Sequence, residues 1–251
     1  MRLTVVGSSG SFPGPDTSSS CYLVEADGFC MVVDLGNGSL GQLQRYVGVD
    51  DIDAVLLSHL HADHCMDVLP LYVARTYDPA GKHPVLPVHA SSGAEEHLTH
   101  AYGRSDQHRL DACFDFVEWT AGTHQVGPFT VTVARVAHPI ETWGMRIEHD
   151  GTVLAYSADT GPCDALVELS RDADAALYES SFEAGRDDKA PVDLHMTGGQ
   201  AGQQATAAGA KRLLLTHLPP WNDPEKSLAA GRASFTGGPV EVVRPGATYE
   251  L

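Results

Sequence analysis

The chain has 251 residues, enough for one large domain with a sizeable core or for two small ones. Its 16 basic and 33 acidic residues give a formal net charge of −17, which disfavours general binding to nucleic acid or to anionic membranes. Five cysteines without a Cys-x-x-Cys pair argue against a disulfide framework or a thiolate zinc site, and they fit a reducing cytoplasm. No apolar run has the length of a signal peptide or a membrane span, so we expect no membrane partner.

Short runs of β-branched residues alternate with Ala-rich or Leu-rich helical patterns along the chain, which indicates a mixed α/β protein. No low-complexity linker interrupts them, and we expect a single domain over residues 1–251. In chain order, the expected elements are a strand at 3–6, a helix at 39–46, strands at 55–57 and 130–136, helices at 164–169 and 199–210, and a strand at 213–215.

Two pairs of segments echo one another. Residues 24–34 and 147–159 each contain a strand-like run, an Asp-Gly turn, a second run and a final aspartate, which is typical of a tight hairpin. The pentapeptides "LLSHL" (56–60) and "LLTHL" (214–218) each end a strand on a histidine. Such short matches also arise by chance in a Leu-rich chain, so a duplicated layout is one of two interpretations. If two sheets pack face to face, the strand ends of both halves meet along one edge.

The segment "AVLLSHLHADHCMDVLP" (54–70) concentrates ligand-type side chains after a buried strand. Imidazole and carboxylate groups bind zinc and similar ions, and a two-metal site needs about seven or eight of them. His59 and His61 alternate on an extended backbone and can reach one ion, whereas Asp63 and His64 lie near a helix start and suit a second. The alternative is a helix start capped by Asp63 or Ser58, which leaves the histidines unexplained.

Three further residues sit at strand ends elsewhere. His138 closes "TVTVARVAHP", Asp159 follows a strand in "AYSADTG", and His217 closes "RLLLTHLPP". Taken singly, each residue has an ordinary explanation. His138 and His217 could be surface or core histidines, and Asp159 could cap a helix that begins near Pro162. Together with the cluster at 59–64, they supply the remaining ligands of a two-metal site.

The order of these motifs resembles a known family. The segments "SSCYLVE…VVDLGNG", "SHLHADH", "VAHP…WGMRIE", "YSADTGP", "LYESSF" and "HMTGGQAGQQATAAGAKRLLLTHLPP" are similar to the metallo-β-lactamase fold and, within it, to the ribonuclease Z and small phosphodiesterase branch. The resemblance covers nearly the whole chain. It implies an α/β fold, the αββα sandwich of two mixed β-sheets packed face to face with helices outside.

The resemblance also implies a ligand set for two divalent ions, zinc or alternatively manganese. One ion is held by His59, His61 and His138, the other by Asp63, His64 and His217, and Asp159 bridges the two. Asp34 is expected to orient ligating histidines, as such ligands require, although a turn residue at a strand end is an equal alternative.

Catalysis is assigned to His195 together with Asp63. Phosphodiesterase members of the fold are similar to this chain in having a histidine at the position of His195. The resemblance implies that His195 protonates the leaving oxygen or donates a hydrogen bond to the phosphorane oxygens. The alternative is a solvent-facing histidine at a helix start. Glu179 in "LYESSF" would hydrogen-bond His195 and keep it charged, unless it is simply an acid at a strand end.

The expected partner is a small phosphodiester rather than a long nucleic acid. Ribonuclease Z enzymes of this size carry a tRNA-clamping arm between the positions that match His138 and Asp159, and the segment between those residues is filled here by the predicted hairpin. The segments "SHLHADHCMDVLPLYVARTYDP" and "THLPPWNDP" resemble actinobacterial atypical cyclic-nucleotide phosphodiesterases. They imply hydrolysis of a 3′,5′-cyclic nucleotide to the 5′-monophosphate by metal-bound hydroxide. Trp143 and Trp221, expected on loops beside ligand segments, would stack a base or pack against the site wall.

Three other functions stay open. They are a ribonuclease Z-like RNA 3′-processing nuclease, a lactone or thioester hydrolase, and a di-iron redox protein, which usually has a carboxylate where His61 stands. Relatives of this kind are often dimers, so a homodimer is also an expectation. The histidines without ligand spacing are expected at the surface: His83, His89, His97, His100, His108, His124 and His149.

Overall fold

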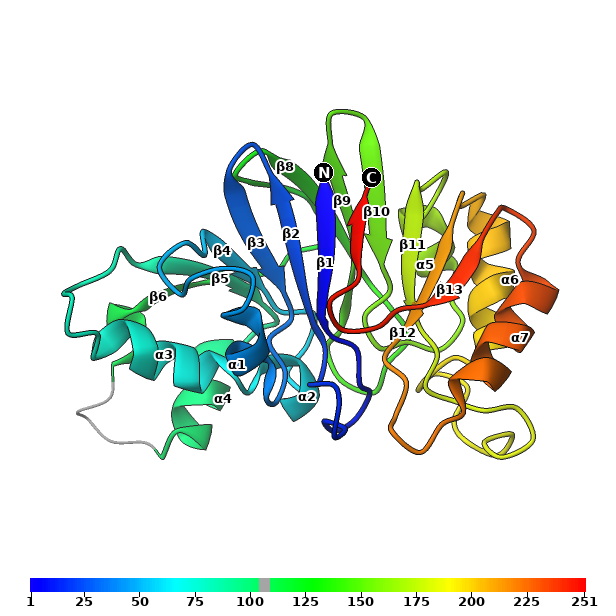
Figure 1. Ribbon diagram of the computed structural model, residues 1–251, viewed down its shortest axis with the longest axis horizontal. Helices are drawn as coiled ribbons and strands as arrows, with labels where there is room; N and C mark the ends of the chain where they lie inside the picture. Colours follow the sequence, from blue (N-terminus) through cyan, green and yellow to red (C-terminus); the bar gives the residue numbers. More distant parts are fainter. Residues whose placement is uncertain (104–108) are drawn as a thin grey trace.

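The computed structural model describes residues 1–103 and 109–251 and contains two mixed β-sheets of seven strands each, packed face to face (Figure 1). Helices cover the outer face of each sheet, which gives the four layers of an αββα sandwich. The fold class predicted from the sequence is therefore confirmed. Within the described ranges, no helix has the length and hydropathy needed to cross a membrane.

Each sheet combines an antiparallel part with a parallel part. The first has the order β14-β1-β2-β3-β4-β5-β6 and the second the order β13-β12-β11-β10-β9-β8-β7. The first sheet contains β1 (Arg2–Gly7), β2 (Cys21–Ala26), β3 (Phe29–Val33), β4 (Ala54–Leu56), β5 (Leu86–Ala90), β6 (Phe114–Glu118) and β14 (Thr248–Glu250). The second contains β7 (Gly122–Val126), β8 (Phe129–Arg135), β9 (Trp143–His149), β10 (Thr152–Tyr156), β11 (Ala175–Glu179), β12 (Leu213–Thr216) and β13 (Val240–Val242).

The helices divide between the two outer layers (Figure 1). On the side of the first sheet lie α1 (Ser39–Leu43), α2 (Ala62–Cys65), α3 (Val68–Thr76), α4 (Ala94–Ala101) and the short 3₁₀ helix η1 (Leu110–Ala112). On the side of the second sheet lie α5 (Asp164–Leu169), α6 (Gly198–Ala208) and α7 (Pro224–Ser234).

Alternating side chains divide each central strand between two hydrophobic layers. In β12, Leu214 enters the core between the sheets, whereas Leu213 and Leu215 pack under the helices. In β4, Leu56 points inward and Val55 outward. Burial of one such side chain contributes about 1.5–3 kcal/mol. Because both faces of these strands are buried, their sequences are continuously apolar.

The two sheets share a layout that only one of the sequence echoes reflects. The hairpins β2–β3 and β9–β10 turn at Asp27-Gly28 and Asp150-Gly151, where all four residues have positive φ. Each hairpin is followed by strands that pair in parallel, β4 to β6 after β3 and β11 to β13 after β10. The two pentapeptides do not occupy equivalent positions. The first overlaps the end of β4, which is next to the hairpin β2–β3, whereas the second overlaps the end of β12, which is separated from the hairpin β9–β10 by β11. The pentapeptide echo is not a sign of duplication.

The predicted elements lie within one or two residues of the observed ones, apart from the first helix. That helix was expected at 39–46, but α1 ends at Leu43. The amides of Arg45 and Tyr46 bond to the carbonyls three residues earlier, so the chain tightens into a turn there.

Candidate metal centre

The predicted ligands converge at one edge of the sandwich, because each follows a strand or begins a short helix at that edge. His59 and His61 follow β4, Asp63 and His64 lie on α2, and His138, Asp159 and His217 follow β8, β10 and β12. Their ligand atoms form two groups, each with all atoms within 4.8 Å of one another. The first group contains His59, His61, His138 and Asp159, and the second contains Asp63, His64, Asp159 and His217.

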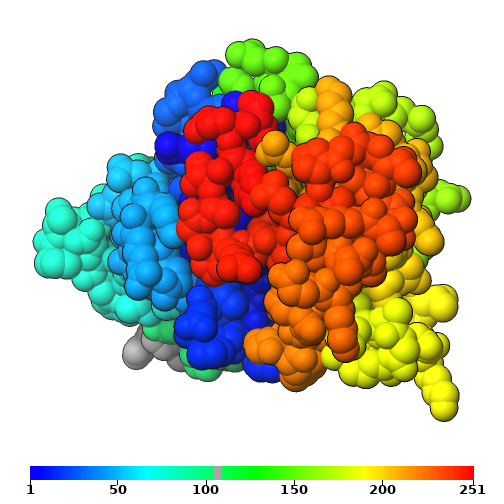
Figure 2. All heavy atoms as spheres, turned by 45° about the vertical axis from the view of Figure 1, so that its right-hand side comes forward, coloured from blue at the N-terminus to red at the C-terminus, as the bar shows by residue number. Residues whose placement is uncertain are grey.

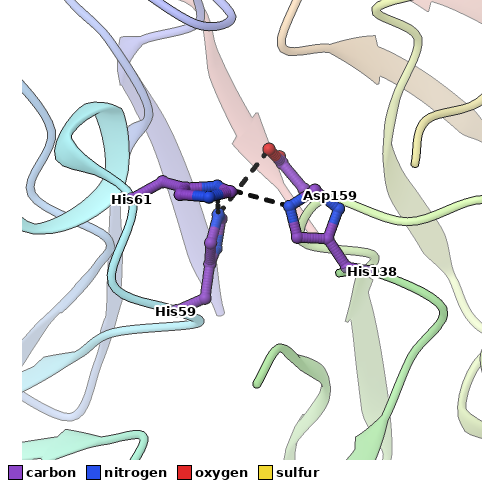
Figure 3. A group of neighbouring side chains, drawn as sticks. All are labelled: His59, His61, His138 and Asp159. Atoms are coloured by element: carbon purple, nitrogen blue, oxygen red, sulfur yellow. Dashed lines mark hydrogen bonds and ion pairs between the residues drawn. The ribbon is translucent and has the colours of Figure 1, made fainter. Parts of the chain in front are cut away.

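In the first group the side chains point toward one another (Figure 3). Nδ1 of His61 lies 3.0 Å from Nε2 of His59 and 3.3 Å from Nε2 of His138. Asp159 approaches from the second sheet, with Oδ2 at 3.7 Å from Nε2 of His59. Segments from both halves of the chain therefore meet at this point.

The second group is equally close and is buried. Nε2 of His64 lies 3.1 Å from Nε2 of His217, which in turn is 3.0 Å from Oδ2 of Asp63. The other oxygen of Asp159, Oδ1, lies 3.2 Å from His64 and 3.3 Å from His217. Asp159 thus presents one oxygen to each group, as a bridging ligand would.

Hydrogen bonds around the first group fix which imidazole nitrogens carry protons. The Ser58 hydroxyl donates to Oδ2 of Asp34 at 2.8 Å, so it accepts the Nδ1 proton of His59 at 3.0 Å. The carbonyl of Leu194 accepts the Nδ1 proton of His138 at 2.9 Å. Both histidines therefore keep an unprotonated Nε2 that faces the other ligands.

The second group follows the same rule. Asp34 accepts the Nδ1 proton of His64 at 2.8 Å. The Ser181 hydroxyl donates to the carbonyl of His217, so it accepts that residue's Nδ1 proton at 2.7 Å. Facing lone pairs at these short separations are the arrangement that a bound cation requires.

The carboxylates give the same indication. Asp34, Asp63, Asp159 and Glu179 are all buried, and Oδ1 of Asp159 accepts no hydrogen bond although it is inaccessible to solvent. Buried charge that lacks an opposite charge is very costly. Because the donor set is nitrogen and oxygen only, it fits one or more divalent cations such as zinc or manganese.

The proton affinities of the ligands also favour a metal. Burial lowers the pKa of His59, His61 and His138, which keeps these imidazoles neutral and able to ligate. Burial opposes ionisation of Asp159, yet His217 and His64 hold its pKa well below the usual range. Burial would also lower the pKa of His64, but the carboxylates of Asp159 and Asp63 raise it well above its usual value. These carboxylates thus attract positive charge, which a divalent ion supplies without a proton.

The backbone at the site contains a feature that the sequence analysis missed. Ser11, Asp34, Ala158 and His217 have φ between 53° and 64°, a region that non-glycine residues seldom occupy. They are four of the seven such non-glycine residues in the described chain. Backbone strain of this kind concentrates at functional sites. The residue types signal it only in part, since Asp and His adopt this conformation more often than most residues, whereas Ser11 and Ala158 give no such sign.

His195 lies beside both ligand groups, with its ring centroid 5.5 Å from that of His138 and 5.8 Å from that of His217. Its Nδ1 bonds to Oε1 of Glu179 at 2.7 Å. Burial would lower the pKa of His195, but Glu179 raises it to about 9. The histidine is thus a cation near neutral pH, with Nδ1 held by Glu179 and Nε2 available to a bound molecule.

Glu179 is itself held firmly. Its two carboxylate oxygens also accept the amide protons of Thr160, Ser181 and Met196 at 2.9–3.2 Å. It therefore joins the segment after Asp159 to the segment that carries His195. The hydrogen bond predicted between Glu179 and His195 is thus present.

A cleft of about 620 Å³ opens beside His195. Its walls include Ser11, Phe182, Arg186, Leu194, His195 and Trp221. Apart from His195, Arg186 is the single basic side chain on the described walls. A volume of this size accommodates a small molecule rather than a folded macromolecule.

One expectation about an individual residue was wrong, and the structure also excludes several of the alternatives. Trp143 is the first residue of β9 and is buried in the core, so it is not on a loop and cannot stack on a substrate. Asp63 and Ser58 do not cap α2, because its N-cap is His61 and no side chain caps it. Asp159 does not cap α5, whose N-cap is Cys163. His195 does not face solvent, since 13% of its side chain is exposed.

The other histidines only partly fit the expected surface location. His97 and His100 are exposed, but His83, His89, His124 and His149 are half-buried, and His108 lies outside the described residues. His89 stacks on Trp119 with ring centroids 4.9 Å apart. The two ring nitrogens of His83 lie 3.2 Å from Asp50 and 2.7 Å from Asp78.

Some functional contacts carry no sequence signal. Ser58, Tyr156 and Ser181 lie inside recognised motifs, and the Tyr156 hydroxyl donates to Asp34 at 2.6 Å, but the Leu194 carbonyl, which accepts the His138 proton, lies outside them. These contacts depend on which segments fold together, and short sequence patterns do not encode that.

Comparisons with known proteins agree with this geometry. A family profile described as "Beta-lactamase superfamily domain" matches residues 31–218. Rv1339 of Mycobacterium tuberculosis is 41% identical over 260 residues, covering 100% of this chain and 92% of that protein. The probable metallo-hydrolase YhfI of Bacillus subtilis is 32% identical, with both chains covered completely. The crystal structure of YhfI superposes with a TM-score of 0.87 over 99% of each chain. A ribonuclease Z of Myxococcus xanthus is 29% identical over 100% of this chain and 98% of its own.

Proposed function

The chain belongs to the β-lactamase superfamily, and on that premise we propose that it is a two-metal phosphodiesterase that hydrolyses 3′,5′-cyclic nucleotides to 5′-monophosphates. Each of the two ligand groups would hold one ion, and Asp159, which belongs to both groups, would be shared between the ions. The observation that carries the proposal is His195, a histidine kept charged by Glu179 and directed at a small cleft beside both groups.

The roles of the chain's residues follow from their contacts. Divalent cations, when bound, lower the pKa of water and stabilise negative charge on a phosphate. Hydrolysis forms a bond between a water oxygen and phosphorus and breaks the bond from phosphorus to the 3′-oxygen, which must gain a proton. The Nε2 proton of His195 is positioned to supply it, because Nδ1 is already bonded to Glu179. Asp63 has a second role, since the Ser11 amide bonds to it at 2.7 Å and links the ligand to the cleft wall.

A ribonuclease Z-like activity is the second candidate, because a ribonuclease Z is among the relatives. Two observations favour a small substrate over RNA. The hairpin β9–β10 takes up most of the segment between His138 and Asp159, where the tRNA-binding arm is expected in that branch. The formal charge of −17 also opposes the phosphate contacts on which RNA affinity depends.

The test is a substrate panel on the metal-loaded protein: cyclic AMP, cyclic GMP, bis-p-nitrophenyl phosphate, precursor tRNA, a lactone and a thioester. We expect turnover of the first three. Cleavage of precursor tRNA alone would instead support the nuclease, and turnover of the lactone or thioester alone would support a non-phosphate hydrolase.

His195→Ala tests the proton donor on the same panel. We expect it to retain metal but to lose about 10²–10⁴-fold in turnover of the cyclic nucleotides, because general acid catalysis contributes that much. His97→Ala, which changes an exposed histidine on α4, is the matched control and should retain full activity. Normal turnover by His195→Ala would exclude the assigned role.

A further inference from the structure

Trp221 is an exposed aromatic ring at the cleft beside His195. The chain has three tryptophans, and Trp119 and Trp143 are 4% and 5% exposed, whereas Trp221 is 63% exposed. Large rings usually lie largely inside a protein. Trp221 lines the cleft near the metal centre, so a ligand bound in the cleft would cover the exposed ring.

The loop that carries Trp221 is anchored, and the ring itself packs on a second aromatic side chain. Trp221 lies in the loop between β12 and α7, and the next residue, Asn222, donates its side-chain amide to the Ser181 carbonyl at 2.9 Å. Phe12, from the loop after β1, packs on Trp221 with ring centroids 4.8 Å apart and a tilt of 46°. These two loops adjoin on the surface, blue beside orange in Figure 2, and both lie at the lower end of the sandwich in Figure 1.

The aromatic pair is also fixed relative to the metal centre. The residue before Phe12 is Ser11, whose amide bonds to Oδ2 of Asp63 at 2.7 Å. The Phe12 carbonyl accepts a hydrogen bond from the Ser9 hydroxyl at 2.7 Å. On the other loop, Trp221 is four positions after the ligand His217, whose ring is anchored by Ser181. The cleft thus has Trp221 and His195 on its walls, and its wall residue Ser11 is hydrogen-bonded to the ligand Asp63.

We propose that Trp221, supported by Phe12, is a stacking platform for the base of a nucleotide phosphodiester. This rests on the proposed phosphodiesterase function and adds a specificity residue to it. The ligand that fits has an anionic diester at one end, for His195 and the cations, and a flat aromatic group at the other. Stacking uses the π-face that every base has, so the platform selects for the presence of a base and not for its identity. Cyclic AMP and cyclic GMP should therefore have similar KM values.

The kinetic test compares cyclic AMP with a base-free 3′,5′-cyclic phosphate of 1-O-methylribose. For Trp221→Ala we expect KM for cyclic AMP to rise between about 5-fold and 150-fold, with kcat changed less than about 2-fold. KM for the base-free diester should not change, and Trp221→Phe should restore most of the affinity. Tyr77→Ala, which removes an aromatic ring of similar exposure outside the cleft, is the control and should match wild type. An unchanged KM for cyclic AMP, or an equal rise for both diesters, would overturn the platform.

A binding test separates this proposal from the proposed function. Since Trp221 is the exposed tryptophan, its fluorescence should be quenched saturably by 5′-AMP and not by ribose 5-phosphate, and Trp221→Phe should abolish the response. If the wild type hydrolyses neither diester, the phosphodiesterase proposal fails, and this titration still decides the platform. Quenching by AMP supports it, and absence of quenching contradicts it.

Discussion

Asp34 links the two ligand groups, although it belongs to neither. Its Oδ2 accepts hydrogen bonds from Ser58, His64 and Tyr156 at 2.6–2.8 Å, and its Oδ1 accepts the Ser58 amide proton at 2.7 Å. Through Ser58 it orients His59, and directly it orients His64, so one carboxylate positions a ligand in each group. Such outer partners determine how well imidazoles bind a metal.

Asp34→Asn should therefore weaken metal binding without removing a ligand. The asparagine amide can take two orientations, and neither satisfies all the donors. With its NH₂ group at the Oδ2 position it would face three hydrogen-bond donors, and with its oxygen there the NH₂ group would face the Ser58 amide. We expect about 10- to 100-fold lower affinity for metal, measured by competition with a chromogenic chelator. Asp53→Asn, at an exposed carboxylate that bonds the Cys30 amide, is the control. Equal affinities for wild type and Asp34→Asn would show that Asp34 does not position the ligands.

Glu179→Gln should change the pH dependence of the reaction. His195 has a pKa raised to about 9, so its protonated form is present below that pH and is lost above it. The stability that the pair contributes is likewise complete below the unfolded pKa of about 6.5 and disappears as pH rises through 9. Without the carboxylate, burial lowers the pKa of His195, and the alkaline limb of kcat/KM should move down by about one pH unit or more.

The control for that profile is Glu183→Gln, a nearby acid that pairs with Lys226 rather than with His195. Its alkaline limb should coincide with that of wild type. An unshifted limb in Glu179→Gln would mean that another group gives the proton to the leaving oxygen.

At the scale of the elements, parallel pairing explains how the site assembles. β4 on one sheet and β11 and β12 on the other run parallel to their neighbours, so their carboxyl ends and the loops after them lie at a shared edge. The hairpins, several helices and strands, and the histidine motif could be predicted from local sequence. The contacts between distant segments could not be predicted in this way. For example, the Trp143 amide donates to the Ser58 carbonyl, and no local sequence pattern around either residue specifies that contact. The resemblance to a family supplied that information.

Gly36→Ala tests the packing that holds α2 and its ligands. A Cβ on Gly36 would lie 1.9 Å from the Asp63 carbonyl oxygen, so the backbone of that ligand must shift. We expect a loss of about 1–3 kcal/mol in the free energy of unfolding, measured in urea, together with lower metal content. Gly41→Ala is the control, because a Cβ there meets nothing within 4 Å and alanine favours the helix. A Gly36→Ala protein with wild-type stability and metal content would contradict this role.

For the whole molecule, the metal centre joins segments from both sheets around buried carboxylates. Asp63 comes from the first half of the chain and Asp159 from the second, and both are buried. Cations bound between them would act as a cross-link that exists only in the folded state, so metal binding and folding would be coupled.

Removal of metal should consequently destabilise the whole fold. A ligand held at about 1,000 times its Kd stabilises the native state by about 4 kcal/mol, and we expect chelation to lower the unfolding temperature correspondingly. Scanning calorimetry with and without EDTA measures this change, and EDTA saturated beforehand with zinc is the control. Identical unfolding temperatures would show that the site contributes nothing to stability.

Anomalous X-ray scattering at the metal absorption edge tests the central claim most directly. We predict two peaks at the edge of the sandwich, one surrounded by His59, His61 and His138 and the other by Asp63, His64 and His217, with Asp159 between them. A single peak, or none at these side chains in protein loaded with zinc or manganese, would contradict the account.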